Sequence, residues 1–155
     1  MMEWVYDDGG REIAGYKGHT GDCVCRAIAI ATGMPYKEVY DLINKFSESE
    51  RKGKRRQHKS SARTGVRPET TRKIMKHLGW EWIPTMTIGS GCKVHLNADE
   101  LPKGTIVVKV TKHVVAVIDG VIHDTYNSSE HGYTVDGNGN DITKDRCVYG
   151  YYRKI

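Results

Sequence analysis

The chain has 155 residues, which is enough for one domain around a single core, and 38% of them are apolar and 28% charged. Its mean hydropathy is −0.57, and no apolar run approaches the roughly 20 residues of a membrane span, so we expect no membrane partner. The net charge of +5 is unevenly spread: residues 51–76 hold eleven lysines and arginines and one acid, while the rest is mildly acidic.

The first predicted helix covers residues 23–32. The N-terminal stretch before it lacks the cationic and apolar pattern of a signal peptide, so we expect a cytoplasmic protein. Asp22 is a suitable N-cap for this helix, and Gly33 is a natural end. Apolar residues recur on one face at helical spacing: Val24, Ala27, Ile28 and Ala31.

Two further predicted helices flank a basic loop. Pro35 begins the second helix, whose apolar stripe extends to Phe46, and Pro68 begins the third, which Gly79 ends. Between them, residues 48–67 are polar and charged and have no periodicity. We predict that they form a long, mobile surface loop.

From Trp80 onward the pattern is typical of β-strands. Asp119-Gly120 is a tight-turn signal that joins two of the predicted strands in a hairpin. No internal repeat or linker divides the chain, and helices come before strands. We therefore predict one α+β domain over residues 1–155, with N-terminal helices packed on a C-terminal antiparallel sheet. The β-branched or aromatic segments are WEWIPTM, TIVVKV, HVVAVID, VIHDTY and CVYGYYRK.

Two cysteines, Cys23 and Cys25, open the first helix. Cys23 is the first helical residue, where free backbone N–H groups and the helix dipole stabilise the thiolate, the nucleophilic form of the side chain. Its own N–H can also hold the oxyanion of an attacked carbonyl. Cys25 lies about 200° further round the helix, on the flank of the apolar stripe. We expect it to be a packed thiol.

A nucleophilic cysteine needs a base, and His113 is the candidate. In a two-residue hairpin, Ile118 pairs with Val121, which puts His113 roughly opposite Tyr126. His113 then shares a face with Asp124, diagonal to it, and His123 falls on the opposite face. A carboxylate at that place can fix the tautomer of the imidazole.

The order of these parts resembles the papain-like cysteine peptidase superfamily, above all its small bacterial and phage branches, the C39-like and NlpC/P60-like peptidases. The resemblance rests on GDC before an apolar helix, on HVVAVIDG and on IHDTYN. It implies a papain-like fold and a cysteine hydrolase, in which Cys23 is the nucleophile, His113 the base and Asp124 the orienting residue. The substrate would be a peptide, a protein or another amide, isopeptide or thioester, met in the host cytoplasm if the gene is carried by a phage.

Many relatives in that superfamily complete the oxyanion hole with a Gln six residues before the cysteine, and Lys17 stands there in this chain. Lys17, His19 and Thr20 are the candidates to replace it, and the sequence does not choose among them.

The chain has four cysteines, with Cys92 and Cys147 distant from the first two. In a reducing cytoplasm they are expected to be free thiols, metal ligands or catalytic groups rather than disulfides. A four-thiolate zinc site is the weaker alternative, because structural zinc sites prefer pairs separated by two to four residues. We expect neither a metal nor a cofactor.

The strongest rival signal is the basic run in the predicted loop. Such clusters attract phosphate backbones through counterion release, although a solvated loop that aids solubility fits equally well. No aromatic residue is interleaved, so any nucleic-acid contact is expected to be weak and indifferent to sequence. The alternative function is a non-catalytic module on a papain-like scaffold that binds nucleic acid or a host protein. The residues concerned are Arg51, Lys52, Lys54, Arg55, Arg56 and Lys59.

Overall fold

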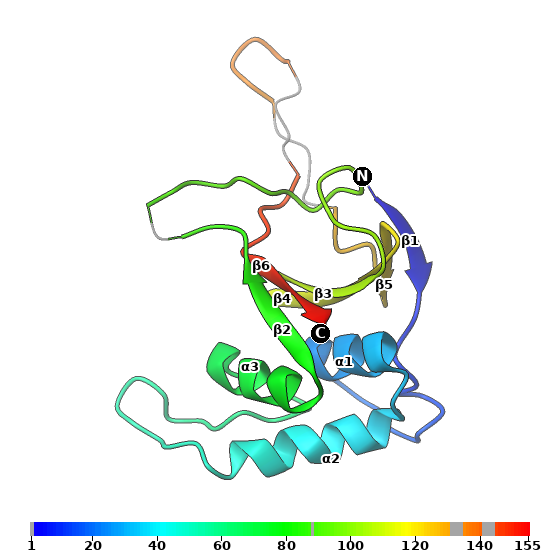
Figure 1. The fold of residues 1–155 in the computed structure, drawn as a ribbon, viewed down its shortest axis with the longest axis vertical. Coiled ribbons are helices and arrows are strands. Elements are labelled where there is room, and N and C mark those ends of the chain that lie inside the picture. The colour runs from blue at the N-terminus through cyan, green and yellow to red at the C-terminus, as the bar shows by residue number, and fades with distance from the viewer. Residues whose placement is uncertain (1, 88, 131–134, 141–144) are drawn as a thin grey trace.

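A computed structural model describes residues 2–87, 89–130, 135–140 and 145–155 (Figure 1). In this part of the chain, three helices accompany a six-stranded mixed sheet with the strand order β1-β5-β4-β3-β6-β2. The elements are β1 (Glu3–Tyr6), α1 (Cys23–Thr32), α2 (Tyr36–Ser47), α3 (Pro68–His77), β2 (Trp80–Pro84), β3 (Thr105–Val110), β4 (His113–Ile118), β5 (Val121–Asp124) and β6 (Gly150–Lys154).

The prediction of a purely antiparallel C-terminal sheet is wrong for one strand. The N-terminal β1 joins the edge of the sheet and runs parallel to β5, while the other strand pairs are antiparallel. All four side chains of β1 are exposed, so its segment EWVY has no buried face to produce a period-two pattern. The fold is therefore mixed α/β, with helices α1, α2 and α3 preceding five of the six strands.

The three helices lie on one side of the sheet: α1 lies directly against β4, α3 contacts β2, and α2 packs on the outside of α1 and α3 (Figure 1). Val114 and Ala116 of β4 face the helices, whereas Val115 and Val117 belong to a second apolar cluster on the other face. Because β4 is buried on both faces, its sequence is a continuous apolar run instead of an alternating one. None of the described helices has both the length and the apolarity needed to cross a membrane.

Tight turns bring the start of β4 and the end of β5 to the same end of the sheet. Asp119 and Gly120 have φ values of 48° and 80°, as a type I′ hairpin turn requires. The predicted register is confirmed at Ile118↔Val121 and continues to Ala116↔His123, where the ladder ends. Asp124 is the next residue of β5 after this ladder, and His113 lies three residues before Ala116 on β4, so both stand past the same end of it.

The basic loop differs from its prediction along part of its length. Residues 51–59 are exposed, as expected, but Ser60 is buried and fastened to the helices. Glu50 accepts the Ser60 N–H at 2.5 Å and also the hydroxyl of Ser60, and Asn44 accepts the Ala62 N–H at 3.0 Å. Residues 60–67 thus differ from the predicted surface loop, because Ser60 and Ala62 are buried. The N–H groups of these two residues are satisfied by polar side chains outside the segment, and such partners leave no periodic signal in the sequence.

The prediction of free thiols is wrong for two of the four cysteines. Cys92 and Cys147 form a disulfide, with 5.8 Å between their Cα atoms, while Cys23 and Cys25 are free. A β-bridge between His95 and Cys147 aligns the two segments, which are far apart in the chain. The disulfide removes two of the four thiolates that the alternative zinc site would need.

Candidate active site

Cys23 is the first residue of α1, at the helix end that lies under the start of β4. The first hydrogen bond within this helix runs from the Arg26 N–H to the Asp22 carbonyl at 3.0 Å, so the N–H groups of residues 23–25 have no acceptor within the helix. The Cys23 sulfur and the His113 imidazole line the same cavity, and Val114, the next residue of β4, lines it too. The thiol therefore lies beside a candidate base and a backbone N–H.

These donors change the acidity of the Cys23 thiol. Burial by itself raises its pKa, but hydrogen bonding to His113, the charge of the imidazolium and the Val114 N–H outweigh that effect. The pKa of Cys23 is consequently below its ordinary value. A lowered thiol pKa is what a cysteine nucleophile needs near neutral pH.

His113 and Asp124 form a buried pair at 2.7 Å between Nε2 and Oδ2. Because Nε2 is bound to the carboxylate, Nδ1 is the nitrogen that remains for the thiol. Burial tends to lower the pKa of His113, but the hydrogen bonds with Asp124 and Cys23 raise it by more. Burial likewise tends to raise the pKa of Asp124, and the His113 interaction lowers it overall.

The expected surroundings of His113 are present. The Tyr126 ring lies 5.4 Å from the imidazole, centroid to centroid, which agrees with the predicted pairing. His123 lies elsewhere, with its Nδ1 3.6 Å from an oxygen of Asp7. The structure therefore brings together the three predicted residues, Cys23, His113 and Asp124, and separates the neighbouring histidine from them.

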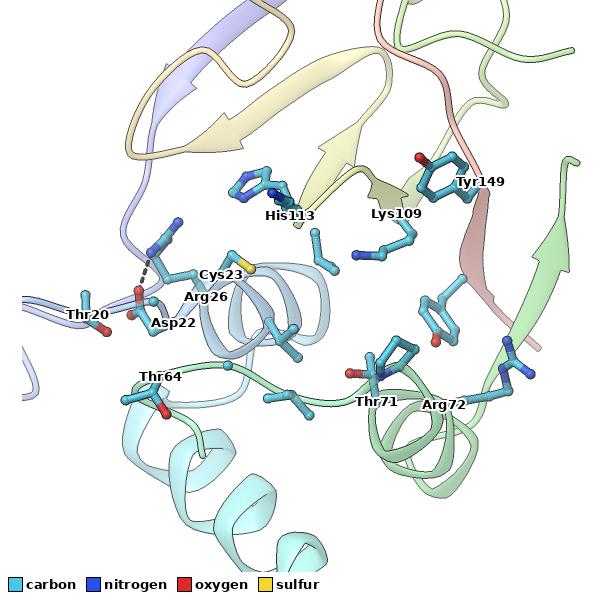
Figure 2. Close-up of a pocket in the computed structure, with 18 of the residues that line it drawn as sticks. Thr20, Asp22, Cys23, Arg26, Thr64, Thr71, Arg72, Lys109, His113 and Tyr149 are labelled. Atoms are coloured by element: carbon cyan, nitrogen blue, oxygen red, sulfur yellow. Dashed lines mark hydrogen bonds and ion pairs between the residues drawn. The ribbon is translucent and has the colours of Figure 1, made fainter. Parts of the chain in front are cut away.

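Arg26 links the helix to the carboxylate of this pair, and sequence reasoning missed it. Its guanidinium contacts Asp124 Oδ1 at 3.1 Å and also binds the carboxylate of Asp22 (Figure 2). Asp22 does not cap α1 with its side chain, contrary to prediction, because its other oxygen accepts the Tyr36 hydroxyl at 2.5 Å. The signal that could have revealed this network is an arginine one turn into an otherwise apolar helix.

The second cysteine of the helix is a packed thiol, as predicted. The Cys25 side chain is fully buried, and its sulfur lies 3.8 Å from the Tyr36 carbonyl oxygen. Burial raises the pKa of Cys25 to about 12. Two cysteines that are separated by one residue thus have opposite shifts in acidity.

A cavity of about 680 Å³ opens beside Cys23, between the strap of residues 64–66, α3 and the ends of β3 and β6 (Figure 2). Of the three oxyanion candidates, Thr20 lines this cavity, but its hydroxyl donates to the Arg63 carbonyl at 3.0 Å. Lys17 and His19 are exposed and are not among the lining residues. The cavity also contains Lys109 and Arg72, which sequence reasoning did not select.

The six residues of the basic run remain outside this cavity. Arg51, Lys52, Lys54 and Arg55 are exposed. Arg56 forms an ion pair with Glu69, and Lys59 donates to the Glu48 carbonyl at 3.3 Å. The described residues contain no cluster of three or more potential metal-ligating side chains.

Comparisons of the chain with protein-family models, with curated proteins and with solved structures found no match. The papain-like resemblance therefore stays a prediction, and a functional assignment depends on the geometry of the site.

Proposed function

We propose that the protein is a cysteine hydrolase that cleaves an amide, isopeptide or thioester with Cys23, His113 and Asp124. The observation that carries this proposal is the hydrogen-bonded pair of His113 and Asp124 beside Cys23, the first residue of α1. His113 Nε2 is held by Asp124 at 2.7 Å, which leaves Nδ1 for a Cys23 thiol whose pKa is lowered. A nucleophile, a base and an orienting carboxylate in contact are the arrangement that acyl transfer requires.

The reaction proceeds in two halves. The Cys23 thiolate attacks the carbonyl carbon, a C–S bond forms, and the C–N bond of an amide breaks as His113 gives its proton to the leaving nitrogen. Water then attacks the thioester while His113 accepts a proton. The carboxylic acid leaves, and the thiolate is restored. Asp124 keeps the imidazole oriented throughout.

The oxyanion is stabilised by the first turn of α1. The N–H of Cys23 has no acceptor within the helix and lies at the positive end of the helix dipole. It is therefore the first donor of the oxyanion hole. The papain-like fold that the resemblance implies is consistent with the same reading, with a peptide or protein as substrate.

The test is acylation by an activated ester. Incubation with p-nitrophenyl acetate is expected to give a burst of p-nitrophenolate and an acetyl adduct that peptide mapping assigns to Cys23. Cys23→Ala should abolish the burst, and His113→Gln should slow it, whereas Cys25→Ala should retain it. An adduct distributed equally over Cys23 and Cys25 would rule out the hydrolase.

A second candidate function uses the exposed run of residues 51–59. Four of its cations, Arg51, Lys52, Lys54 and Arg55, face solvent, where they are accessible to a phosphate backbone. This function predicts salt-sensitive binding of DNA or RNA that survives Cys23→Ala and is lost when the four cations are neutralised.

A further inference from the structure

The cavity beside Cys23 has an excess of positive charge that the described carboxylates do not neutralise. Among the described residues that line it, Asp22 is the one carboxylate, and its side chain has no exposed surface. Asp22 is already bound to Arg26 and Tyr36. The basic lining residues Arg72, Lys109 and Lys112 have no ion pair with a described carboxylate.

Lys109 is the cation placed next to the reacting sulfur. It pairs with Val114 in the ladder between β3 and β4, and Val114 is the residue whose backbone N–H helps to lower the pKa of Cys23. Figure 2 shows the Lys109 ammonium and the Cys23 sulfur extending into the same cavity. Burial, with a smaller contribution from the charge of Arg146, lowers the pKa of Lys109 although the nearby Cys23 and Tyr149 act to raise it. Its ammonium is thus partly desolvated without a carboxylate partner.

Aromatic rings form the far wall of the cavity beside Lys109. Trp82 packs against Tyr152 with 4.9 Å between ring centroids, and the Arg72 guanidinium lies 5.2 Å from the Trp82 ring. The position of the Trp82 ring depends on a glycine at position 150, which pairs with Lys109 in the ladder between β3 and β6. A Cβ there would come within 2.4 Å of the indole. The cavity therefore offers a cation with an apolar wall behind it.

We propose that this cavity binds an acidic acyl substrate, a peptide with a carboxylate side chain next to the scissile bond, and that Lys109 is the specificity-determining counter-ion of that carboxylate. The inference rests on the proposed hydrolase function and names its substrate class. A carboxylate that enters the cavity accepts a charge-assisted hydrogen bond from Lys109 and gives this partly buried ammonium an ion-pair partner.

The test compares two alkylating agents of similar size, iodoacetate and iodoacetamide, of which only the first carries a carboxylate. The rate constant for Cys23 is measured with each, and their ratio is expressed relative to the same ratio for 2-mercaptoethanol. The rate constant with iodoacetamide measures the reactivity of the Cys23 thiolate. The ratio measures how strongly the cavity favours a reagent that carries a carboxylate. Lys109→Gln should lower the ratio roughly fivefold, since it removes one charge near the reagent. Lys109→Arg should retain most of it.

Lys103→Gln is the matched control, because Lys103 is an exposed lysine outside the cavity. A ratio in Lys109→Gln equal to that in Lys103→Gln would overturn the substrate class while leaving the hydrolase intact. If iodoacetamide reacted with Cys23 no faster than with Cys25, the proposed function itself would fail.

A binding measurement keeps the substrate class testable in that second case. Titration of the labelled protein with N-acetylglutamate is expected to shift the NMR signals of Lys109 and Val114, and N-acetylglutamine should shift them much less. Equal shifts with the two ligands would contradict an anion site, whatever the reactivity of the thiol.

Discussion

The charged groups at the start of α1 and those in the loop of residues 51–59 differ in burial and in pairing. Asp22, Arg26 and Asp124 are all buried, and each contacts a charge of the opposite sign. The loop cations are exposed, and Arg56 has the one ion pair with a carboxylate that the structure gives them. In the first region the partners of each charged side chain fix its position. In the second region water can replace any contact that a cation makes.

This difference explains why charge density alone is a poor guide to function. The loop has the highest density of charge in the sequence, but an exposed, solvated cation contributes little to the free energy of unfolding, so changing its neighbour has a small effect. A buried charge constrains every group around it, because leaving it unpaired is costly. The buried charges of Asp22, Arg26 and Asp124 therefore determine where His113 lies, and His113 in turn determines the reactivity of Cys23.

The largest expected effect is on the buried network. Arg26→Met leaves the carboxylates of Asp22 and Asp124 buried without their shared cation, and we expect it to lower the free energy of unfolding by about 3–5 kcal/mol in urea titrations. Arg56→Met, which breaks the exposed pair with Glu69, should cost less than about 1 kcal/mol. Equal losses in the two variants would remove the distinction between the regions. Should Arg26→Met not fold, Arg26→Lys tests the same contact with the charge kept.

A smaller effect is expected from the hydroxyl that supports Asp22. Tyr36→Phe removes the 2.5 Å hydrogen bond to this buried carboxylate, which should lower the free energy of unfolding by about 1.5–3 kcal/mol. Tyr40→Phe is the matched control, because Tyr40 packs in the same aromatic group on α2. Its loss should stay within about 0.5 kcal/mol. A similar cost at both tyrosines would mean that Asp22 does not depend on this donor.

The next prediction concerns the pH dependence of the thiol. The rate of Cys23 alkylation by iodoacetamide follows the thiolate fraction, so its midpoint should lie below the ordinary thiol value of 9.0. In the unchanged protein the His113 imidazolium lowers the pKa of Cys23 and burial raises it. His113→Gln removes the first effect and keeps the second, so the midpoint should move upward. Each unit of that shift lowers the rate at neutral pH about tenfold.

His123→Gln is the control for this measurement, since His123 contacts Asp7 and not the thiol. It should leave the midpoint in place. A midpoint in His113→Gln that equals that of the unchanged protein would separate His113 from the acidity of Cys23. Cys25, with a pKa of about 12, should remain unlabelled across the neutral range in all variants.

The pair of His113 and Asp124 could be predicted because its signal is local: the register Ile118↔Val121 follows from the two-residue turn. The position of Cys23 beside this pair depends on packing of α1 against the sheet, and the papain-like resemblance was the basis for expecting it. Arg26 could not be assigned from sequence, since its partners Asp22 and Asp124 are brought together only by packing of α1 against the sheet. The Cys92–Cys147 disulfide and the parallel β1 depend likewise on long-range contacts.

The smallest effect on the fold is expected from the basic run itself. Exchanging Arg51, Lys52, Lys54 and Arg55 for glutamine removes exposed charges that make no ion pair with a described carboxylate, so the free energy of unfolding should change by less than about 0.5 kcal/mol per site. The alkylation rate of Cys23 should also persist, because none of the four lines its cavity. Electrophoretic mobility shifts with single-stranded and duplex DNA at two salt concentrations then separate the two functions. If the unchanged protein bound DNA and the variant did not, with Cys23 equally reactive in both, the loop would be a second binding surface beside the hydrolase. A loss of thiol reactivity in the same variant would show instead that the loop and the site act together, against the comparison drawn above.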